Sequence, residues 1–104
     1  MSPDEEQRLL KSLDRGGKAN ALLGSDIYQE AFREVERAII DKWKDCPIRD
    51  VEGQTTLKMM HKLLSDVRGY IEQVAEDGKM ASITLEHERS MKDRAKQALR
   101  VFSR

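Results

Sequence analysis

The residues best able to do chemistry in this sequence are two histidines and one cysteine, and they are widely separated. His61, His87 and Cys46 fall on three different predicted elements. A zinc site needs several donors on neighbouring turns or in a paired spacing, and these residues form neither pattern. Nucleophilic catalysis by Cys46 would need a base held beside it, and no local motif supplies one. The sequence therefore predicts no catalytic residue and no metal site.

The acidic residues and the glycines also lack the patterns of an active site. Carboxylates are abundant, but on helices such residues usually pair with Lys or Arg three or four positions away. The six glycines form neither a Walker loop nor a dinucleotide-binding fingerprint, so no phosphate-binding loop is indicated. We therefore expect no cofactor, no small-molecule substrate and no enzymatic activity.

One group of side chains has a plausible ligand, and it lies at the C-terminal end. The basic residues of this group are Arg89, Lys92, Arg94, Lys96, Arg100 and Arg104. A single acid, Asp93, stands among them. Basic residues at helical spacing could follow the phosphates of a nucleic acid. The sequence favours a second interpretation, in which they complement the helix C-terminal dipole and an acidic surface of a partner.

The composition limits the fold class. The chain has 104 residues, of which 38% are hydrophobic and 37% are charged. That composition suits helices with wide solvated faces better than a thick core, and it makes oligomerisation a natural supplement to folding. Lys and Arg balance Asp and Glu 19 to 19. No field of one sign therefore steers the whole molecule toward nucleic acid or membrane.

Disulfides and targeting segments are not indicated. Cys46 is the single cysteine, which excludes an internal disulfide and agrees with a reducing compartment. The acidic N-terminus lacks an apolar signal segment, and no stretch approaches the roughly 20 apolar residues that cross a bilayer. The sequence therefore predicts a cytoplasmic protein without membrane contact.

Capping patterns predict a short first helix and a longer second one. The run Ser2–Glu5 is typical of a helix start, and Gly16 with Gly17 is predicted to end this helix. Ser25 is expected to cap the second helix, and Pro47 to end it because proline has no amide hydrogen to donate. The expected helix ranges are 3–14 and 26–45.

The clearest apolar pattern lies in a third predicted helix, which Asp50 would cap. Spacings of three and four alternate along Leu57, Met60, Leu64, Val67, Ile71 and Val74. Such a pattern is typical of a coiled-coil seam, and Met59, Leu63 and Tyr70 widen it enough to contact two neighbours. Gly78 is predicted to end this helix, and a fourth helix with a thinner apolar face follows. The expected ranges are 51–77 and 80–102.

These elements predict an all-α fold, a small helical bundle of three main helices with a short N-terminal helix. Residues 1–24 would form an arm and connector, and residues 25–104 the bundle domain. Gly69 costs its helix about 1 kcal/mol relative to alanine, which suggests a close approach of another segment there. Large apolar side chains on such helices are core residues or interface anchors. The interface candidates are Tyr28, Phe32, Trp43, Met59, Leu63, Tyr70, Leu99 and Phe102.

Several short stretches carry a resemblance to a known class of protein. They are Ala31–Glu36, Trp43-Lys44, Glu52-Gly53, Val67–Glu72 and Gly78–Ala81. In these, and over about residues 26–86, the chain resembles short helical proteins encoded by tailed bacteriophages and prophages. The resemblance implies a protein contact made in virion assembly, at the head, scaffold or connector. It also leaves open a phage factor that blocks a host defence protein, and it would place the chain in the host cytoplasm or in the virion.

We therefore expect a nonenzymatic helical protein whose work is binding to other proteins. Its partners would be copies of itself, in a homo-oligomer, or a phage structural protein, and the apolar surface left over from the coiled-coil seam would make the contacts. The alternatives are a small regulatory protein that binds nucleic acid through its basic C-terminal helix, and an inhibitor of a host protein.

Overall fold

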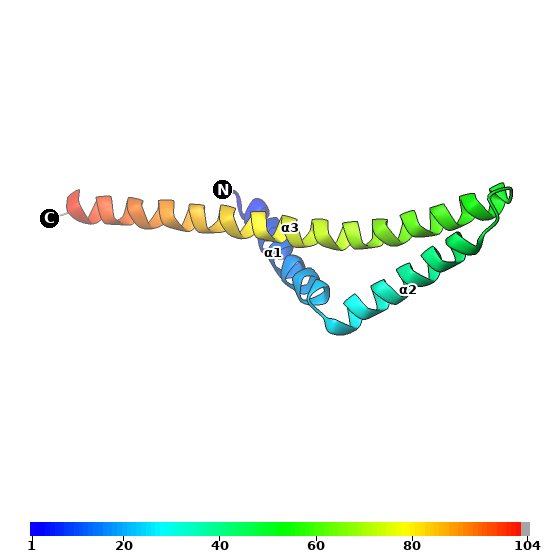
Figure 1. The fold of residues 1–104 in the computed structure, drawn as a ribbon. Coiled ribbons are helices and arrows are strands. Elements are labelled where there is room, and N and C mark those ends of the chain that lie inside the picture. Colours follow the sequence, from blue (N-terminus) through cyan, green and yellow to red (C-terminus); the bar gives the residue numbers. More distant parts are fainter. Residues whose placement is uncertain (103–104) are drawn as a thin grey trace. The chain divides into compact units, whose positions relative to one another are not determined.

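The computed structural model describes residues 1–102 as three helices joined by short connections (Figure 1). The helices are α1 (Pro3–Leu23), α2 (Asp26–Asp45) and α3 (Val51–Phe102). Helix accounts for 91% of the described residues, and these residues contain no strand. The predicted all-α class is confirmed.

α1 begins where the sequence predicts and ends later. The Glu5 amide donates a hydrogen bond to the Ser2 hydroxyl over 3.2 Å, which caps the helix start. Gly16 and Gly17 do not end the helix, so the predicted range 3–14 is wrong at its C-terminal side. A glycine ends a helix by adopting the left-handed conformation, and no glycine in the described part of the chain has a positive φ.

α2 has the bounds that the sequence predicts. The Ser25 hydroxyl accepts a hydrogen bond from the Tyr28 amide, and Cys46 in an extended conformation closes the other end. Pro47 follows directly and cannot continue the helix. Local chemistry therefore sets both ends of this element.

α3 is a single helix of 52 residues where the sequence predicts two. It starts as expected, because the Asp50 carboxylate accepts a hydrogen bond from the Gly53 amide over 3.0 Å. It then continues through Gly78, so the predicted ranges 51–77 and 80–102 are parts of one element. Glycine lowers helix propensity but does not by itself break a helix, and here Gly78 and Ala81 are buried against a neighbouring helix.

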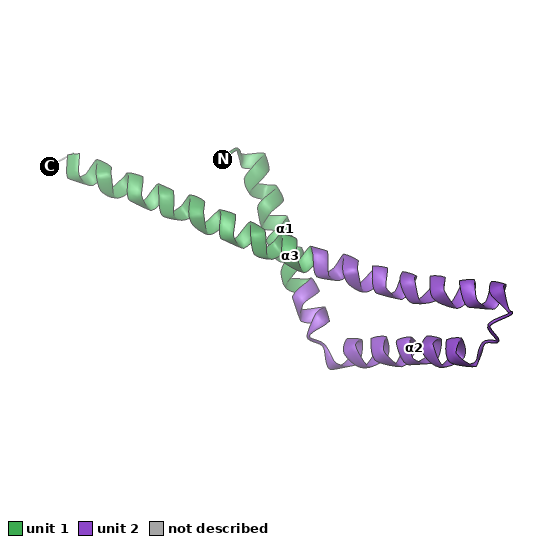
Figure 2. Ribbon diagram, turned by 45° about the horizontal axis from the view of Figure 1, so that its top comes forward, with its two compact units in different colours: residues 1–18, 74–104 green, residues 19–73 purple. Residues whose placement is uncertain are grey.

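Contacts divide the chain into two compact units (Figure 2). The first unit contains Met1–Lys18 of the N-terminal region and the part of α3 from Val74 onward. The second unit contains Ala19–Gln73, in which α2 and the first half of α3 form a helical hairpin. The contacts that hold two helices together differ between the two units.

In the first unit, α1 and α3 cross with their backbones in contact. A Cβ atom added to Gly16 would lie 2.5 Å from the Cα of Gly78, and one added to Gly78 would lie 3.0 Å from the Ser12 carbonyl oxygen. Ala81, one turn further along α3, is only 2% exposed. The missing Cβ atoms therefore allow this crossing. The expected close approach at Gly69 is wrong, because nothing lies within 4 Å of a Cβ placed there.

In the second unit, the hairpin core is narrow. Phe32 and Ile39 of α2 are buried, and they face the half-buried residues Leu57, Leu64 and Ile71 of α3. The other members of the predicted seam within this unit are Met60 and Val67, and both are exposed. Half of the predicted seam thus packs against α2, and the other half does not.

Candidate protein-interaction surfaces

A single glutamine joins the two helices at the closed end of the hairpin. The Trp43 indole N–H donates to the Gln54 Oε1 atom over 2.6 Å. Gln54 in turn donates through Nε2 to the Cys46 carbonyl at 3.0 Å and to the Pro47 carbonyl at 3.4 Å. The helix end and the following turn are therefore tied to α3 by side-chain hydrogen bonds.

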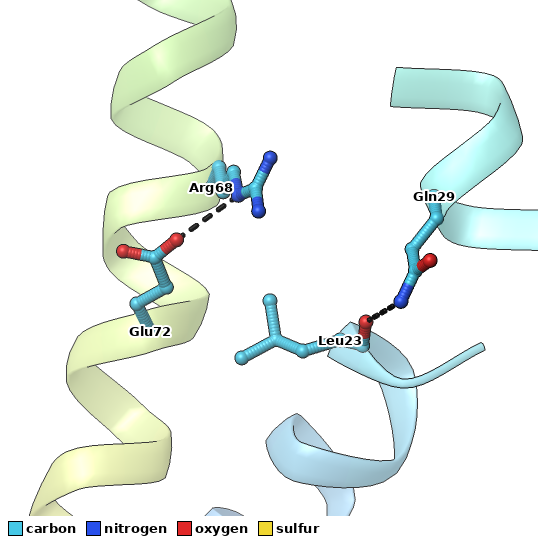
Figure 3. Close-up of polar contacts among 4 residues, drawn as sticks. All are labelled: Leu23, Gln29, Arg68 and Glu72. Carbon is cyan, nitrogen blue, oxygen red and sulfur yellow. Dashed lines mark hydrogen bonds and ion pairs between the residues drawn. The ribbon is translucent and has the colours of Figure 1, made fainter. Parts of the chain in front are cut away.

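Further from the turn, polar side chains of α3 take positions that an apolar seam would fill. The Arg68 guanidinium lies over the Phe32 ring, 4.9 Å from its centre. The Arg68 Nε donates to a Glu72 carboxylate oxygen over 3.0 Å, as Figure 3 shows. His61 Nε2 lies 3.5 Å from a Glu36 carboxylate oxygen. These contacts connect α2 and α3 in the middle of the hairpin.

The start of α2 is tied back to α1 by a short side-chain contact. Gln29 donates through Nε2 to the Leu23 carbonyl over 2.9 Å, as Figure 3 shows beside the Arg68 pair. Tyr28, one of the interface candidates, is half-buried, and its buried hydroxyl has no hydrogen-bond partner among the described residues. Such a group costs about 1–3 kcal/mol relative to a satisfied one. Tyr28 therefore stabilises the hairpin through its ring, whose centre lies 6.3 Å from the centre of the Phe32 ring, and not through its hydroxyl.

The hairpin has one apolar side, which we call the apolar hairpin face. It is formed by Ala31, Val35 and Ala38 of α2 and by Met60, Leu63 and Val67 of α3, all of them exposed. In each helix these residues come one position before those that face the other helix, and one position rotates a side chain by about 100°. Because α2 and α3 are antiparallel, the same rotation in both helices leads to the same side of the hairpin.

The opposite side of the hairpin is mostly polar, although Ile40 also lies there and Lys58 and Ser65 line a groove together with Trp43 and Met59. The polar residues of this side come one position after those that face the other helix. They are Gln29, Arg33 and Lys44 of α2 and Lys58, Ser65 and Glu72 of α3, and all are exposed. The hairpin as a whole is therefore amphipathic, with its apolar side at the surface of the chain.

The remaining interface candidates separate into two groups. Phe32 is buried and Trp43 is half-buried inside the hairpin. Exposed fractions are 59% for Met59, 60% for Leu63, 65% for Tyr70, 68% for Leu99 and 87% for Phe102. The exposed group therefore offers apolar surface, whereas the buried aromatic residues serve the fold.

The basic end of α3 is exposed along its length. Arg89, Lys92, Arg94, Lys96 and Arg100 are all exposed, and Arg104 lies outside the described residues. A groove in the first unit is lined by three acids, Glu6, Glu88 and Asp93, beside the basic residues Arg89, Lys92 and Lys96. Acids of the same unit thus offset part of the positive charge.

Cys46 is held in its neutral form. Desolvation by its surroundings, together with the neighbouring negative charge of Asp50, raises the pKa of the Cys46 thiol above its ordinary value. The sulfur lies 3.8 Å from a carboxylate oxygen of Asp50, to which the thiol donates. A nucleophilic cysteine needs the opposite environment, one that stabilises the thiolate.

Several kinds of site are not found. The described residues hold no group of three or more His, Cys, Asp or Glu that could bind a metal ion. No helix in that part of the chain is both long and apolar enough to cross a membrane. Comparison with protein-family models, with curated proteins and with solved structures found no match to this chain. A functional proposal for this chain must therefore be argued from its own residues.

Proposed function

We propose that this chain is a nonenzymatic protein that works by packing its helices against helices of other chains, including copies of itself. The observation that carries the proposal is the imbalance between core and surface. Among the described residues the buried hydrophobic ones are Ala19, Phe32, Ile39 and Ala81. Nineteen large apolar side chains, by contrast, are exposed. Contiguous exposed apolar surface marks sites of protein association, since water contact with it is unfavourable.

The apolar hairpin face supports the proposal most directly, because its residues are regular rather than scattered. Fully burying a Val, Leu or Met side chain stabilises by about 1.5–3 kcal/mol. Three such residues of α3 and one of α2 keep about half of their surface in water within the single chain: Met60, Leu63, Val67 and Val35. Packing with another chain would supply the burial that one chain does not, and would complete the bundle that the sequence predicts.

In the biological setting that the resemblance implies, the partner is a component of a tailed-phage particle, at the head, scaffold or connector. Light scattering over a range of concentrations, together with co-expression and co-purification with such components, tests the proposal. The expected results are concentration-dependent mass or a stable complex with one component. A chain that stays monomeric and also binds no virion component would contradict it.

The exposed basic end of α3 supports a second candidate function, binding to nucleic acid. Arg89, Lys92, Lys96 and Arg100 recur at spacings of three and four, as needed to follow phosphates. Replacing Lys96 and Arg100 with Gln should then flatten the slope of log affinity against log salt concentration, by about one for each phosphate that is no longer neutralised. Absence of binding to duplex and to single strands at low salt would exclude this function.

A further inference from the structure

The mostly polar side of the hairpin carries an excess of positive charge. Its basic residues are Arg33, Arg37 and Lys44 of α2 and Lys58 and Lys62 of α3, all of them exposed. Arg37 lies 3.1 Å from Glu34, and the other four make no ion pair within the part of the chain that the structure describes. The acid on the same side, Glu72, is paired with Arg68. This side therefore attracts anions.

A groove on this side combines aromatic, aliphatic and basic side chains. It is lined by Trp43, Lys58, Met59, His61, Lys62 and Ser65. The centres of the Trp43 and His61 rings lie 6.5 Å apart. The Trp43 N–H donates to Gln54, which holds the indole in one orientation, and the side chain is only half-buried. The groove therefore presents a fixed aromatic ring in company with two lysines.

This combination fits one kind of anionic ligand better than others. Lys58 and Lys62 are four residues apart on α3, so they lie about 6 Å apart along the helix axis and can bind two anionic groups of one chain. Single-stranded nucleic acid offers a row of phosphates together with flat bases that stack on aromatic side chains. A duplex keeps the faces of its bases stacked inside, and an acidic polypeptide such as polyglutamate has no ring to stack. The groove therefore matches a single strand.

We propose that the groove at Trp43 binds single-stranded nucleic acid, with a base stacked on the indole ring and backbone phosphates on Lys58 and Lys62. Arg33 and Lys44 extend the positive surface across α2. The site shares no residue with the apolar hairpin face or with the basic end of α3, so it adds a ligand that the proposed function does not contain. One side of the hairpin packs against protein, and the other holds a strand.

The first test uses the fluorescence of Trp43, which is the single tryptophan of the chain. Titration of the full chain with an oligothymidine of about 15 nucleotides at low salt should quench this fluorescence, because a base stacks on the ring. A duplex of the same length and polyglutamate can contact the lysines but cannot stack, so neither should quench it. Absence of quenching by the single strand, or equal quenching by either competitor, would contradict the proposal.

The second test compares lysines on the two sides of the hairpin. Lys62→Gln removes one charge from the groove and should reduce the slope of log affinity against log salt concentration by about 0.7, the value for one phosphate of a single strand. Lys42 comes one position before Trp43, on the side of the apolar hairpin face, and is exposed. Lys42→Gln removes the same charge there and should leave the slope unchanged. Equal changes in the two variants would overturn the assignment of the groove.

The third test separates stacking from the fold. Trp43→Phe and Trp43→Leu both lose the hydrogen bond to Gln54, but only phenylalanine keeps an aromatic face. Fluorescence anisotropy of a dye-labelled oligothymidine should show a loss of affinity of a few-fold for Trp43→Phe and of about tenfold or more for Trp43→Leu. Circular dichroism checks that both variants keep their helix content. If both lose affinity equally, no base stacks at this position.

These measurements also distinguish the groove from the other proposed surfaces. Lys96→Gln combined with Arg100→Gln should leave the quenching of Trp43 intact. Binding that depends on those two residues and not on Lys62 belongs to the basic end of α3, which overturns the groove as a site. None of the three tests measures association between protein chains, so their failure leaves the proposed packing function standing.

Discussion

The crossing of α1 and α3 and the hairpin of α2 and α3 hold helices together by opposite means. At the crossing, Gly16 and Gly78 bring two backbones into contact, and the absence of side-chain atoms is what matters. In the hairpin, side chains fill the space, with Arg68 over Phe32 and Gln54 bound to Trp43. The crossing should therefore tolerate no added atom, whereas the hairpin should lose stability in steps as individual contacts are removed.

The largest expected effect is at the crossing. Gly78→Ala places a Cβ 2.6 Å from the Gly16 Cα, so the helices must separate. We expect a loss of about 1–3 kcal/mol in the free energy of unfolding, despite the better helix propensity of alanine. Urea unfolding followed by circular dichroism measures it. The matched control is Gly69→Ala in the same helix, where space is open and a gain of up to about 1 kcal/mol is expected. Shifts of the same sign in both variants would contradict the account of the crossing.

The next effect is at the closed end of the hairpin. Gln54→Ala leaves the part-buried Trp43 N–H and the Cys46 carbonyl without their partner, and should cost about 1–2 kcal/mol. Tryptophan fluorescence during urea unfolding reports it at Trp43 itself. Gln97→Ala, at an exposed position of the same helix, should change stability little. If the two substitutions cost the same, Gln54 does not hold the hairpin closed.

A smaller effect is expected in the middle of the hairpin. Arg68→Met keeps an unbranched apolar stem but removes the cation above the Phe32 ring, and should cost about 0.5–1 kcal/mol. Glu72→Gln removes only the exposed ion pair with Arg68, whose side chains are 49% and 55% exposed, and should cost less. Thermal unfolding of both variants compares them. A larger loss for Glu72→Gln would show that the ring contact contributes nothing.

The smallest effect concerns reactivity rather than stability. Asp50→Asn removes the negative charge beside Cys46 while an asparagine still caps α3, so the raised pKa of the thiol should fall. The thiolate fraction at pH 8 then increases, and alkylation by iodoacetamide should become faster. An unchanged or slower rate would mean that Asp50 does not influence the thiol.

Local chemistry in the sequence is enough to predict the class and most helix ends. Ser2, Ser25 and Asp50 cap helices as predicted, and Pro47 follows the end of α2. The prediction of Gly78 as a helix end is wrong. A glycine can end a helix or allow another backbone to approach, and the choice depends on a partner 62 positions away, at Gly16. No local pattern contains that information.

The sequence predicts the interaction surfaces only in part, because the faces that become buried also depend on residues far away along the chain. The predicted apolar seam is present in α3, but spacings of three and four residues do not show which of its members face α2. His61 and Arg68 lie on the α2 side although neither is apolar, because Glu36 and the Phe32 ring offer them partners. The role of Gln54 has no sequence pattern at all, since it depends on the geometry of the turn.

The central claim is that the exposed apolar surface of this chain is a packing surface for other copies. Unfolding temperature as a function of concentration tests it most directly, because association with the folded form alone raises Tm as concentration rises. Over a roughly hundredfold range of full-length chain concentration, the account predicts a Tm that climbs by several degrees. A Tm that stays constant over the same range would contradict it.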